Sequence, residues 1–255
     1  MKKLVIIVTV QVVLETWLKG QAKFLSNYYE VEIITAPSHT ISSIESYENV
    51  SIKTMDFNRQ INFFKDIKVL IQLWFYLLKE KPTIVYTLTP KAGLLGMMAS
   101  WLSGVKHRVH CVVGLPHLEA EGNRKKILTI TEKITYFFSS KIYCNSIHLK
   151  EIVMSMTSKS VDVIGNGSVN GVDTEYFKNR LSNEEKNQVL EKLGFTTDDF
   201  IITFVGRIVK DKGINELLRV FNELSLKYAN IKLLLIGDYK NESDLNFKRE
   251  YEYHR

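Results

Sequence analysis

Short apolar runs alternate with longer amphipathic stretches along most of this chain. The runs are rich in Val and Ile and too short for helices, so they predict buried strands. Strands are predicted at residues 4–10, 31–35, 50–54, 83–86, 107–113, 141–144 and 161–164, with helices at 14–26, 61–79, 92–102, 124–138 and 146–156. Strands that alternate with helices of this size favour βαβ units, and therefore a doubly wound, parallel α/β sheet.

The same pattern resumes near the C-terminus, with strands predicted at 200–205 and 231–236 and a helix at 214–228. The stretch GNGSVNGVDTEYF at 165–177 is a series of turn-forming residues and separates the two regions. We therefore predict an N-terminal doubly wound domain at 1–173 and the start of a second domain at 174–255. The second domain contains a single βαβ unit, which cannot bury both faces of its sheet, so we expect this domain to be incomplete.

Ligands of doubly wound sheets bind at the carboxyl ends of the strands. Three predicted strand ends carry polar or glycine-rich sequence: TLTPKAGLLG at 87–96, GLPHLEAEG at 114–122 and the turn-rich stretch 165–177. Each also has a structural interpretation, namely helix packing, a solvated loop and a linker. These segments are candidate sites, and the pattern alone leaves both interpretations open.

A fourth strand end is the sequence FVGRIVKDKG at 204–213. Two glycines, Gly206 and Gly213, enclose a turn that contains Arg207 and Lys212 and leads into a predicted helix. A strand, a basic turn and a helix N-terminus are the geometry in which backbone N–H groups and cations hold phosphate. The alternative is an ordinary βα loop with solvated charges.

The composition is that of a globular protein, with 45% apolar and 24% charged residues among 255. A net charge of +6 favours anionic partners, but the lysines are dispersed and no basic-aromatic module indicates nucleic-acid binding. The two cysteines, Cys111 and Cys144, lie in strand-like runs, which predicts buried free thiols in a reducing compartment. No metal-ligand spacing occurs, so we expect a metal-independent protein without a cofactor.

Two apolar stretches have a membrane-related alternative. Lys2-Lys3 followed by LVIIVTVQVVL resembles a signal peptide, but Gln11 interrupts the run and no small-residue cleavage site follows, which favours a buried strand. Residues 65–81 are apolar on most sides with lysines at both ends. This pattern fits a helix packed on the sheet better than an interfacial membrane helix.

The segments TLTPKAGLLG, GLP, YCNS, GNGSVNGVDTEYF and FVGRIVKDKG occur in this order between Lys2 and about Gly237. Together they resemble a retaining, family 4-like glycosyltransferase of the GT-B fold from bacterial capsule, O-antigen (lipopolysaccharide) or exopolysaccharide biosynthesis. The resemblance implies a hexosyltransferase with two Rossmann-like domains: an N-terminal acceptor-side domain, and a C-terminal nucleotide-sugar donor domain that is incomplete here. It also implies a lipid-linked saccharide acceptor and a cytoplasmic protein in peripheral contact with the anionic inner face of the cytoplasmic membrane.

The resemblance also assigns site residues. Arg207 and Lys212 match ligands of the donor diphosphate, and Gly206 allows the backbone to approach it. Charge leaves with the nucleoside diphosphate, and fixed cations stabilise that charge without a metal. Expected acceptor-side and cleft residues are Lys91, Gly93, Gly114 and Glu119, and the expected hinge residues are Asn170, Gly171 and Asp173.

The sequence departs from the family pattern in two respects. Val113 occupies the position of a histidine that contacts the donor sugar, so no catalytic residue is assigned, and His110 is expected to be an ordinary strand histidine. The family's acidic Glu-x7-Glu motif is not assigned to any part of this sequence, and the stretch after Asp173 is shorter than the roughly 150 residues of a full donor domain. We therefore expect a truncated chain with little activity alone.

Two other functions remain as alternatives. One is a non-catalytic, truncated remnant that binds the acceptor or a partner protein. The other is a dinucleotide-dependent enzyme, which is disfavoured because no G-x-G-x-x-G motif follows the first predicted strand.

Overall fold

The computed structural model describes residues 1–58 and 62–238 and divides the chain into two compact units, Met1–Val172 and Asp173–Arg255. The predicted start of a helix at Ile61 and most of the stretch predicted to be irregular after Gly237 lie outside the described residues. Each unit is described separately below.

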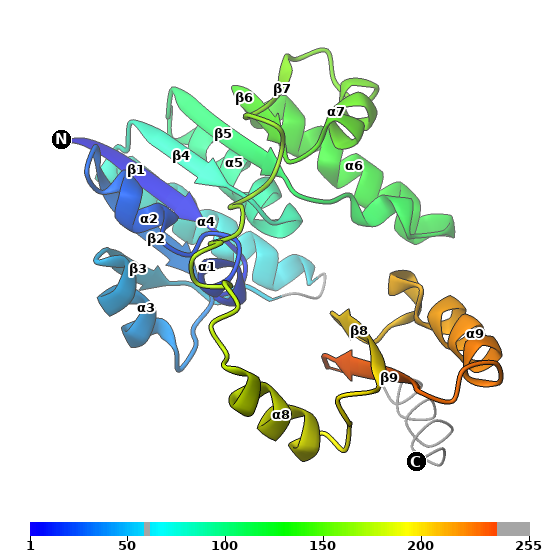
Figure 1. Ribbon diagram of the computed structural model, residues 1–255. Coiled ribbons are helices and arrows are strands. Elements are labelled where there is room, and N and C mark those ends of the chain that lie inside the picture. Colours follow the sequence, from blue (N-terminus) through cyan, green and yellow to red (C-terminus); the bar gives the residue numbers. More distant parts are fainter. Residues whose placement is uncertain (59–61, 239–255) are drawn as a thin grey trace. The chain divides into compact units, whose positions relative to one another are not determined.

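The first unit is built on a parallel seven-stranded sheet with the order β3-β2-β1-β4-β5-β6-β7 (Figure 1). The predicted doubly wound α/β fold is therefore confirmed. β1 lies in the middle of the sheet, and its residues from Leu4 to Ile7 are buried, as expected for a strand covered on both faces. The strands are β1 Lys2–Ile7, β2 Tyr29–Thr35, β3 Ser51–Thr54, β4 Ile84–Thr87, β5 His107–Val112, β6 Lys141–Cys144 and β7 Val161–Val163.

Helices cover both faces of this sheet (Figure 1). Val5 and Ile7 of β1 pack with α4 and α5, whereas Leu4 and Ile6 pack with the short helices α1 and α2. Alternate residues of one strand thus supply two cores on opposite faces. The helices of this unit are α1 Val12–Glu15, α2 Gln21–Leu25, α3 Ile41–Glu48, α4 Phe63–Glu80, α5 Pro90–Leu102, α6 Gly122–Phe138 and α7 Ile147–Met154.

The single helix predicted at residues 14–26 is wrong, because Gly20 in a left-handed conformation (φ 77°) separates α1 from α2. The buried side chain of Glu48 accepts hydrogen bonds from the backbone N–H groups of Gly20 (2.5 Å) and Lys23 (3.0 Å). A carboxylate at this position satisfies N–H groups that the first turn of a helix leaves unpaired. Glu48 ends α3, a helix that the sequence pattern also missed.

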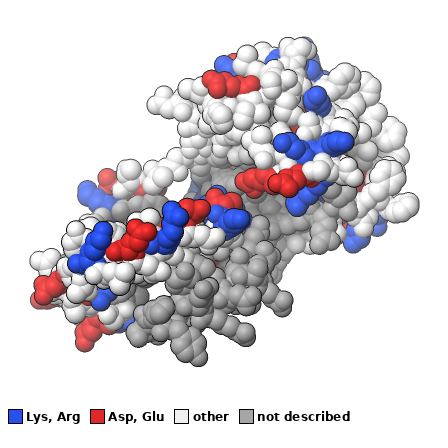
Figure 2. All heavy atoms as spheres, turned by 90° about the vertical axis from the view of Figure 1, so that its right-hand side faces the viewer, with Lys and Arg blue, Asp and Glu red and all other residues white. Residues whose placement is uncertain are grey.

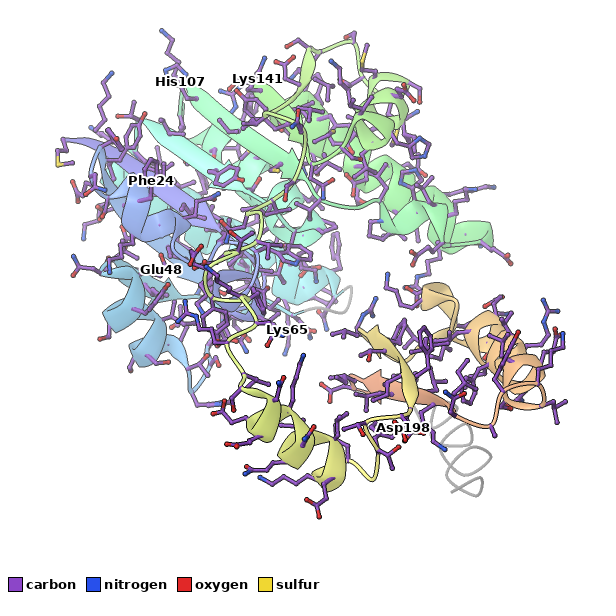
Figure 3. The ribbon with its side chains drawn as sticks, in the orientation of Figure 1. Phe24, Glu48, Lys65, His107, Lys141 and Asp198 are labelled. Carbon is purple, nitrogen blue, oxygen red and sulfur yellow. The ribbon has the colours of Figure 1, made fainter. Side chains whose placement is uncertain are left out.

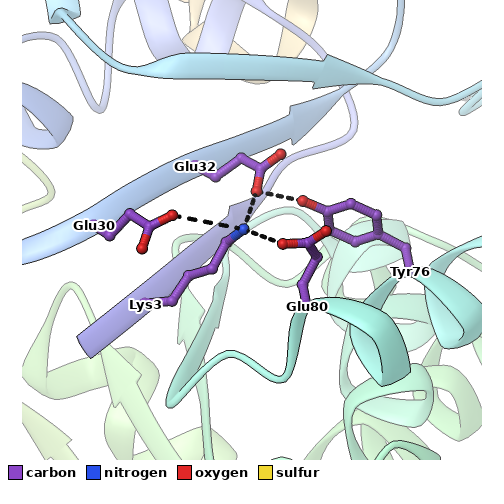
Figure 4. A network of polar contacts seen from close by, with 5 residues as sticks. All are labelled: Lys3, Glu30, Glu32, Tyr76 and Glu80. Atoms are coloured by element: carbon purple, nitrogen blue, oxygen red, sulfur yellow. Dashed lines mark hydrogen bonds and ion pairs between the residues drawn. The ribbon is translucent and has the colours of Figure 1, made fainter. Parts of the chain in front are cut away.

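A network of charged residues joins β1, β2 and α4 at the amino ends of the strands (Figure 4). Lys3 Nζ lies 2.9 Å from Glu32 Oε2 and 2.5 Å from Glu80 Oε2, and the Tyr76 hydroxyl donates to Glu32. Burial opposes the charge on Lys3, but hydrogen bonds to the two carboxylates outweigh it and raise its pKa. The hydrogen bond from Lys3 lowers the pKa of Glu80. The network fastens the C-terminal part of α4 to the beginnings of β1 and β2.

The described part of the second unit contains helix α8 Asn183–Lys192 and a parallel pair of strands, β8 Phe200–Val205 and β9 Ile231–Ile236, joined through helix α9 Ile214–Ser225. α9 packs on the pair through Ile214 and Leu218. No residue of the two strands is fully buried, whereas β1 is buried throughout most of its length. α8 was not predicted, although Ser182 and Glu185 form a capping box at its start.

Candidate functional site

The basic turn of the second unit follows β8 and leads into α9. A 3-10 turn, Lys210–Lys212, precedes α9, and Gly213 caps that helix with φ 71°. Asp211 lies between the two predicted phosphate ligands: its Oδ2 is 3.5 Å from Arg207 Nη2 and 3.4 Å from Lys212 Nζ. All three side chains are partly exposed. The carboxylate therefore holds the two cations near one another at the N-terminus of a helix, an arrangement suited to binding an anion.

The backbone beneath this turn is closely packed. Gly206 N donates a hydrogen bond to Ile236 O (2.9 Å), and Ile208 N donates to Asp238 O (3.1 Å), so the β8–β9 pairing extends into the turn. A Cβ atom on Gly237 would lie 1.7 Å from Gly206 O. Sequence reasoning gave no role to Gly237 or Asp211. The repeated pattern of a strand followed by glycine, in β8–Gly206 and β9–Gly237, was the signal that could have identified Gly237.

In the first unit, the ends of β1 and β4 are joined by hydroxyl groups. Thr89 Oγ1 lies 2.6 Å from Thr9 Oγ1 and accepts a hydrogen bond from Thr9 N (3.1 Å). Lys91, in the first turn of α5, forms an ion pair with Asp66 of α4 (Nζ–Oδ1 2.8 Å), and both side chains are mostly buried. The structure thus places the predicted cleft residue Lys91 in a contact between two helices.

Gly93 packs against the buried His110 of β5. A Cβ atom at Gly93 would approach His110 Cε1 to 2.5 Å, and the imidazole is held by a hydrogen bond between its Nδ1 and Thr87 Oγ1 (2.8 Å). Burial lowers the pKa of His110 to about 4. These contacts agree with the expectation that His110 is a structural strand residue, and they give Gly93 a packing role.

The loop after β5 is divided between exposed and buried residues. Gly114 is exposed, with open space where a Cβ would be, and Glu119 is exposed after the 3-10 turn Pro116–Leu118. His117 of the same turn is buried, and its Nδ1 has no hydrogen-bond partner in the described chain. Burial and then the charge of Lys125 lower its pKa. Gly114 and Glu119 are therefore the predicted acceptor-side residues that remain accessible.

Three of the sequence motifs meet at the ends of β5, β6 and β7. Asn145 Nδ2 donates to Val113 O (3.3 Å), and a Cβ at Gly167 would lie 2.7 Å from Asn145 O. Asn145 Oδ1 is buried without a partner in the described residues. The segments GLP, YCNS and GNG are thus packed together, although sequence reasoning gave Asn145 no role.

Behind this edge lies a buried carboxylate that sequence reasoning also missed. Glu132 of α6 is buried next to Tyr136, and burial raises its pKa to about 7. The Tyr136 ring lies 6.3 Å from that of His110, measured between centroids. A group of buried polar side chains thus lies between α6 and the sheet: Glu132, Tyr136, His110 and Thr87.

The predicted hinge residues lie at the boundary between the two units, which falls between Val172 and Asp173. Asn170 Nδ2 donates to Lys19 O (3.0 Å), and Gly171 has φ 74°. Asp173 Oδ1 accepts hydrogen bonds from the backbone N–H groups of Glu175 (3.1 Å) and Tyr176 (2.9 Å). The hydrogen bonds on each side of the boundary therefore stay within one unit.

Over residues 1–58 and 62–238, no group of three or more His, Cys, Asp or Glu side chains could hold a metal ion, and no helix is long and apolar enough to cross a membrane. Cys111 and Cys144 are free thiols. On the face shown in Figure 2, Lys and Arg side chains are interspersed with Asp and Glu rather than gathered into one basic surface.

The parallel sheet, the polar strand ends and the second unit with its basic turn define an α/β protein of the GT-B class. A family model described as glycosyl transferase 4-like matches residues 6–146, which is more than half of the chain. A second model, glycosyl transferases group 1, matches residues 185–253. The chain belongs to the glycosyl transferase 4-like family.

Two relatives are similar over most of this chain. The capsular polysaccharide biosynthesis glycosyltransferase CapM of Staphylococcus aureus is 35% identical over 233 residues, which cover 90% of this chain and 60% of that protein. The UDP-Gal:alpha-D-GlcNAc-diphosphoundecaprenol alpha-1,3-galactosyltransferase of Escherichia coli is 31% identical over 75% of this chain and 51% of its own length. This chain thus spans about half to three fifths of the length of these curated relatives.

A solved structure supports the fold independently. Anabaena Alr3699/HepE, in complex with UDP and glucose, matches 99% of this chain and 65% of its own with a TM-score of 0.72. The sequences are only 14% identical, so this likeness shows the fold alone.

Proposed function

We propose that this protein takes part in the transfer of a sugar from a nucleotide-sugar donor to a lipid-linked saccharide in surface polysaccharide biosynthesis. Membership of the glycosyl transferase 4-like family supports transfer of a sugar. The name of the Staphylococcus aureus relative supports capsule biosynthesis, and that of the Escherichia coli relative a UDP-sugar and a diphosphoundecaprenol-linked acceptor. The protein would then work in the cytoplasm, in peripheral contact with the membrane that holds the acceptor.

The basic turn around Asp211 carries the donor side of this proposal. A nucleoside diphosphate gains negative charge when the bond to the sugar breaks, and preorganised cations stabilise that charge in the transition state. Arg207 and Lys212 would bind the diphosphate, in place of their contacts with Asp211, and the N–H groups at the start of α9 would add to the attraction. This assignment requires neither a metal ion nor a cofactor.

The acceptor side would be formed by the loop after β5. Gly114 and Glu119 are exposed there, and a carboxylate is suited to accept hydrogen bonds from sugar hydroxyls. Lys91 and Gly93 would help to hold α5 in place beside this loop, Lys91 through its ion pair with Asp66 and Gly93 through its packing against His110. We propose that Asn170, Gly171 and Asp173 act as the hinge between the acceptor and donor units.

Isothermal titration with UDP tests the donor assignment. Arg207→Ala and Lys212→Ala should each weaken UDP binding by about 1.5–3 kcal/mol, roughly 10- to 150-fold, because each removes a hydrogen bond to a charged group. Arg219→Ala is the matched control, since Arg219 is an exposed cation of α9 away from the turn. Equal affinities of the control and the two turn variants would refute the assignment. Loss of UDP binding in a chelator, restored by Mn²⁺, would refute metal independence.

A further inference from the structure

The helices on one face of the first unit expose a continuous set of apolar side chains. α4 packs on the sheet through Val69, Leu73 and Leu77, as predicted for residues 65–81, but its opposite side is also apolar. We call the following ten exposed apolar residues of α4, α5 and α6 the outer helix face: Phe64, Ile67, Ile71, Phe75, Leu78, Trp101, Leu102, Ile127, Ile130 and Phe137.

The outer helix face follows helical periodicity and continues from one helix to the next. Its five residues on α4 are spaced three or four apart, so they form one stripe about 21 Å long at 1.5 Å per residue. Trp101 of α5 contacts Phe138 of α6, with ring centroids 5.2 Å apart, and Phe138 contacts Phe137 at 5.1 Å. On the other side, Ser103 Oγ donates to Trp74 O of α4 (3.2 Å).

The exposed charges within the three helices have one sign. Every exposed charged residue within the described helices α4, α5 and α6 is Lys or Arg: Lys65, Lys68, Lys79, Arg124, Lys125, Lys126 and Lys133. The acidic residues of these helices are withdrawn, because Asp66 pairs with Lys91, Glu80 pairs with Lys3, and Glu132 is buried. The helices therefore combine exposed apolar side chains with exposed charges that are all positive, although the exposed Glu121 immediately precedes α6.

A hollow of about 370 Å³ adjoins the face where α4 and α5 end. Leu78 belongs to both the hollow and the outer helix face, and the charged or titratable residues that line the hollow are Lys81, Lys106 and His107. His107 begins β5, and Figure 3 shows it at the opposite end of the first unit from Lys65, which lies in the first turn of α4. A hollow of this size, lined by two lysines and a histidine, fits a phosphate group.

We propose that the outer helix face docks on an anionic lipid bilayer, with lipid phosphate groups in the hollow lined by Lys81 and Lys106. Aromatic and aliphatic side chains enter the interface between headgroups and acyl chains, and the surrounding lysines meet the lipid phosphates. A second copy of this chain fits less well, because the same cations would face one another across a dimer interface. The proposal specifies the membrane contact proposed above, and its test requires neither donor nor acceptor.

Co-sedimentation of the 255-residue chain with lipid vesicles tests the apolar part of this proposal. The chain should bind vesicles of equal parts phosphatidylcholine and phosphatidylglycerol, and bind poorly to phosphatidylcholine alone. Phe75→Ser should reduce vesicle binding about tenfold, because moving a Phe side chain out of water strengthens binding by roughly this factor or more. Phe24→Ser is the matched control: both phenylalanines are 60% exposed, but Phe24 lies on α2, on the other face of the sheet (Figure 3).

The charged part is tested with Lys81→Gln/Lys106→Gln. Each lysine near an anionic surface raises the affinity for the membrane about fivefold, so the double variant should bind vesicles about 25-fold more weakly. The control variant Lys19→Gln/Lys23→Gln should bind vesicles nearly as well as the parent. Equal binding by the Phe75 and Phe24 variants, or binding that does not depend on phosphatidylglycerol, would overturn the proposal. So would a dimer, seen by size-exclusion chromatography, that Phe75→Ser dissociates. UDP titration of the same variants should be unchanged, which separates this proposal from the donor assignment.

Discussion

Gly237 and Gly206 are in such close backbone contact that a Cβ atom on Gly237 would lie 1.7 Å from the carbonyl oxygen of Gly206. The contact joins the ends of β8 and β9 immediately below the basic turn. Gly237 also has φ 155°, a conformation that other residues rarely adopt. The position of Arg207 therefore depends on a glycine thirty residues further along the chain.

Gly237→Ala should weaken the β8–β9 pair by about 2 kcal/mol or more, because backbone strain and a backbone clash add together. Hydrogen exchange of peptides from Phe200–Val205 and Ile231–Ile236, followed by mass spectrometry, measures this effect. Gly194→Ala is the control: Gly194 has φ 75° but open space around it, so strain alone should cost about 1 kcal/mol. Equal exchange in the two variants would contradict the tight contact.

Gly93→Ala should destabilise the first unit by about 1–3 kcal/mol, since the added methyl group would meet the buried His110 ring. All three tryptophans, Trp17, Trp74 and Trp101, lie in this unit, so tryptophan fluorescence during urea unfolding reports its stability. Gly114→Ala, with no atom within 4 Å, should be nearly neutral. A neutral Gly93→Ala would mean that Gly93 does not hold α5 close to β5.

Glu132→Gln should stabilise the first unit increasingly as the pH rises. The folded carboxyl group has a pKa of about 7 against an ordinary 4.5, so the folded state binds its proton more tightly than the unfolded state. The protonated Glu132 side chain therefore contributes fully to the stability of the fold when the pH is below the pKa of the unfolded state. This contribution is lost as the pH rises through the pKa of the folded state. The glutamine variant avoids this loss, which amounts to about 3 kcal/mol above neutral pH.

Urea unfolding of both proteins at about pH 5 and pH 8 tests this prediction by tryptophan fluorescence. The difference between variant and parent cancels the contribution of His110, whose lowered pKa acts in both proteins. Glu121→Gln, at an exposed position before α6, is the control and should show no such trend. A stability difference that does not change with pH would show that Glu132 is ionised normally.

Asp211→Asn should strengthen UDP binding severalfold, most clearly at low salt. The Asp211 carboxylate neutralises part of the positive charge of Arg207 and Lys212 and competes with phosphate for both side chains. Titration with UDP at two salt concentrations provides the measurement. Asp198→Asn, an exposed aspartate of the same unit, is the matched control (Figure 3). Weaker binding by Asp211→Asn would mean that the carboxylate positions the cations more than it competes with the ligand.

Much of the fold follows from sequence because the strands are short runs of buried, β-branched residues. The first strand was predicted at residues 4–10 and lies at Lys2–Ile7, and the run that contains Ile6 and Ile7 is buried in the middle of the sheet. The helices α3 and α8 escaped prediction because they bury little: Ile44 is the one hydrophobic residue that α3 buries, and α8 buries none. Helices with so few buried apolar residues lack the apolar periodicity from which a helix is predicted.

The candidate site was less predictable, because its residues are joined by contacts distant in sequence. Arg207 and Lys212 could be proposed from their place in a strand–turn–helix motif. The contact of Lys91 with Asp66, and that of Gly93 with His110, depend on how α5 packs against its neighbours. The buried state of Glu132 has no local signal, because it is set by the sheet beneath α6.

The hydrogen bonds on either side of Val172 indicate where the halves of two related chains could be joined into a chimera. Asn170 is tied to Lys19 of the first unit, and Asp173 caps a turn that belongs to the second. A splice at the peptide bond between Val172 and Asp173 would leave both sets of hydrogen bonds intact. Family members with different sugar preferences could therefore exchange whole halves at this bond, and each transplanted half would carry its own end of the connection.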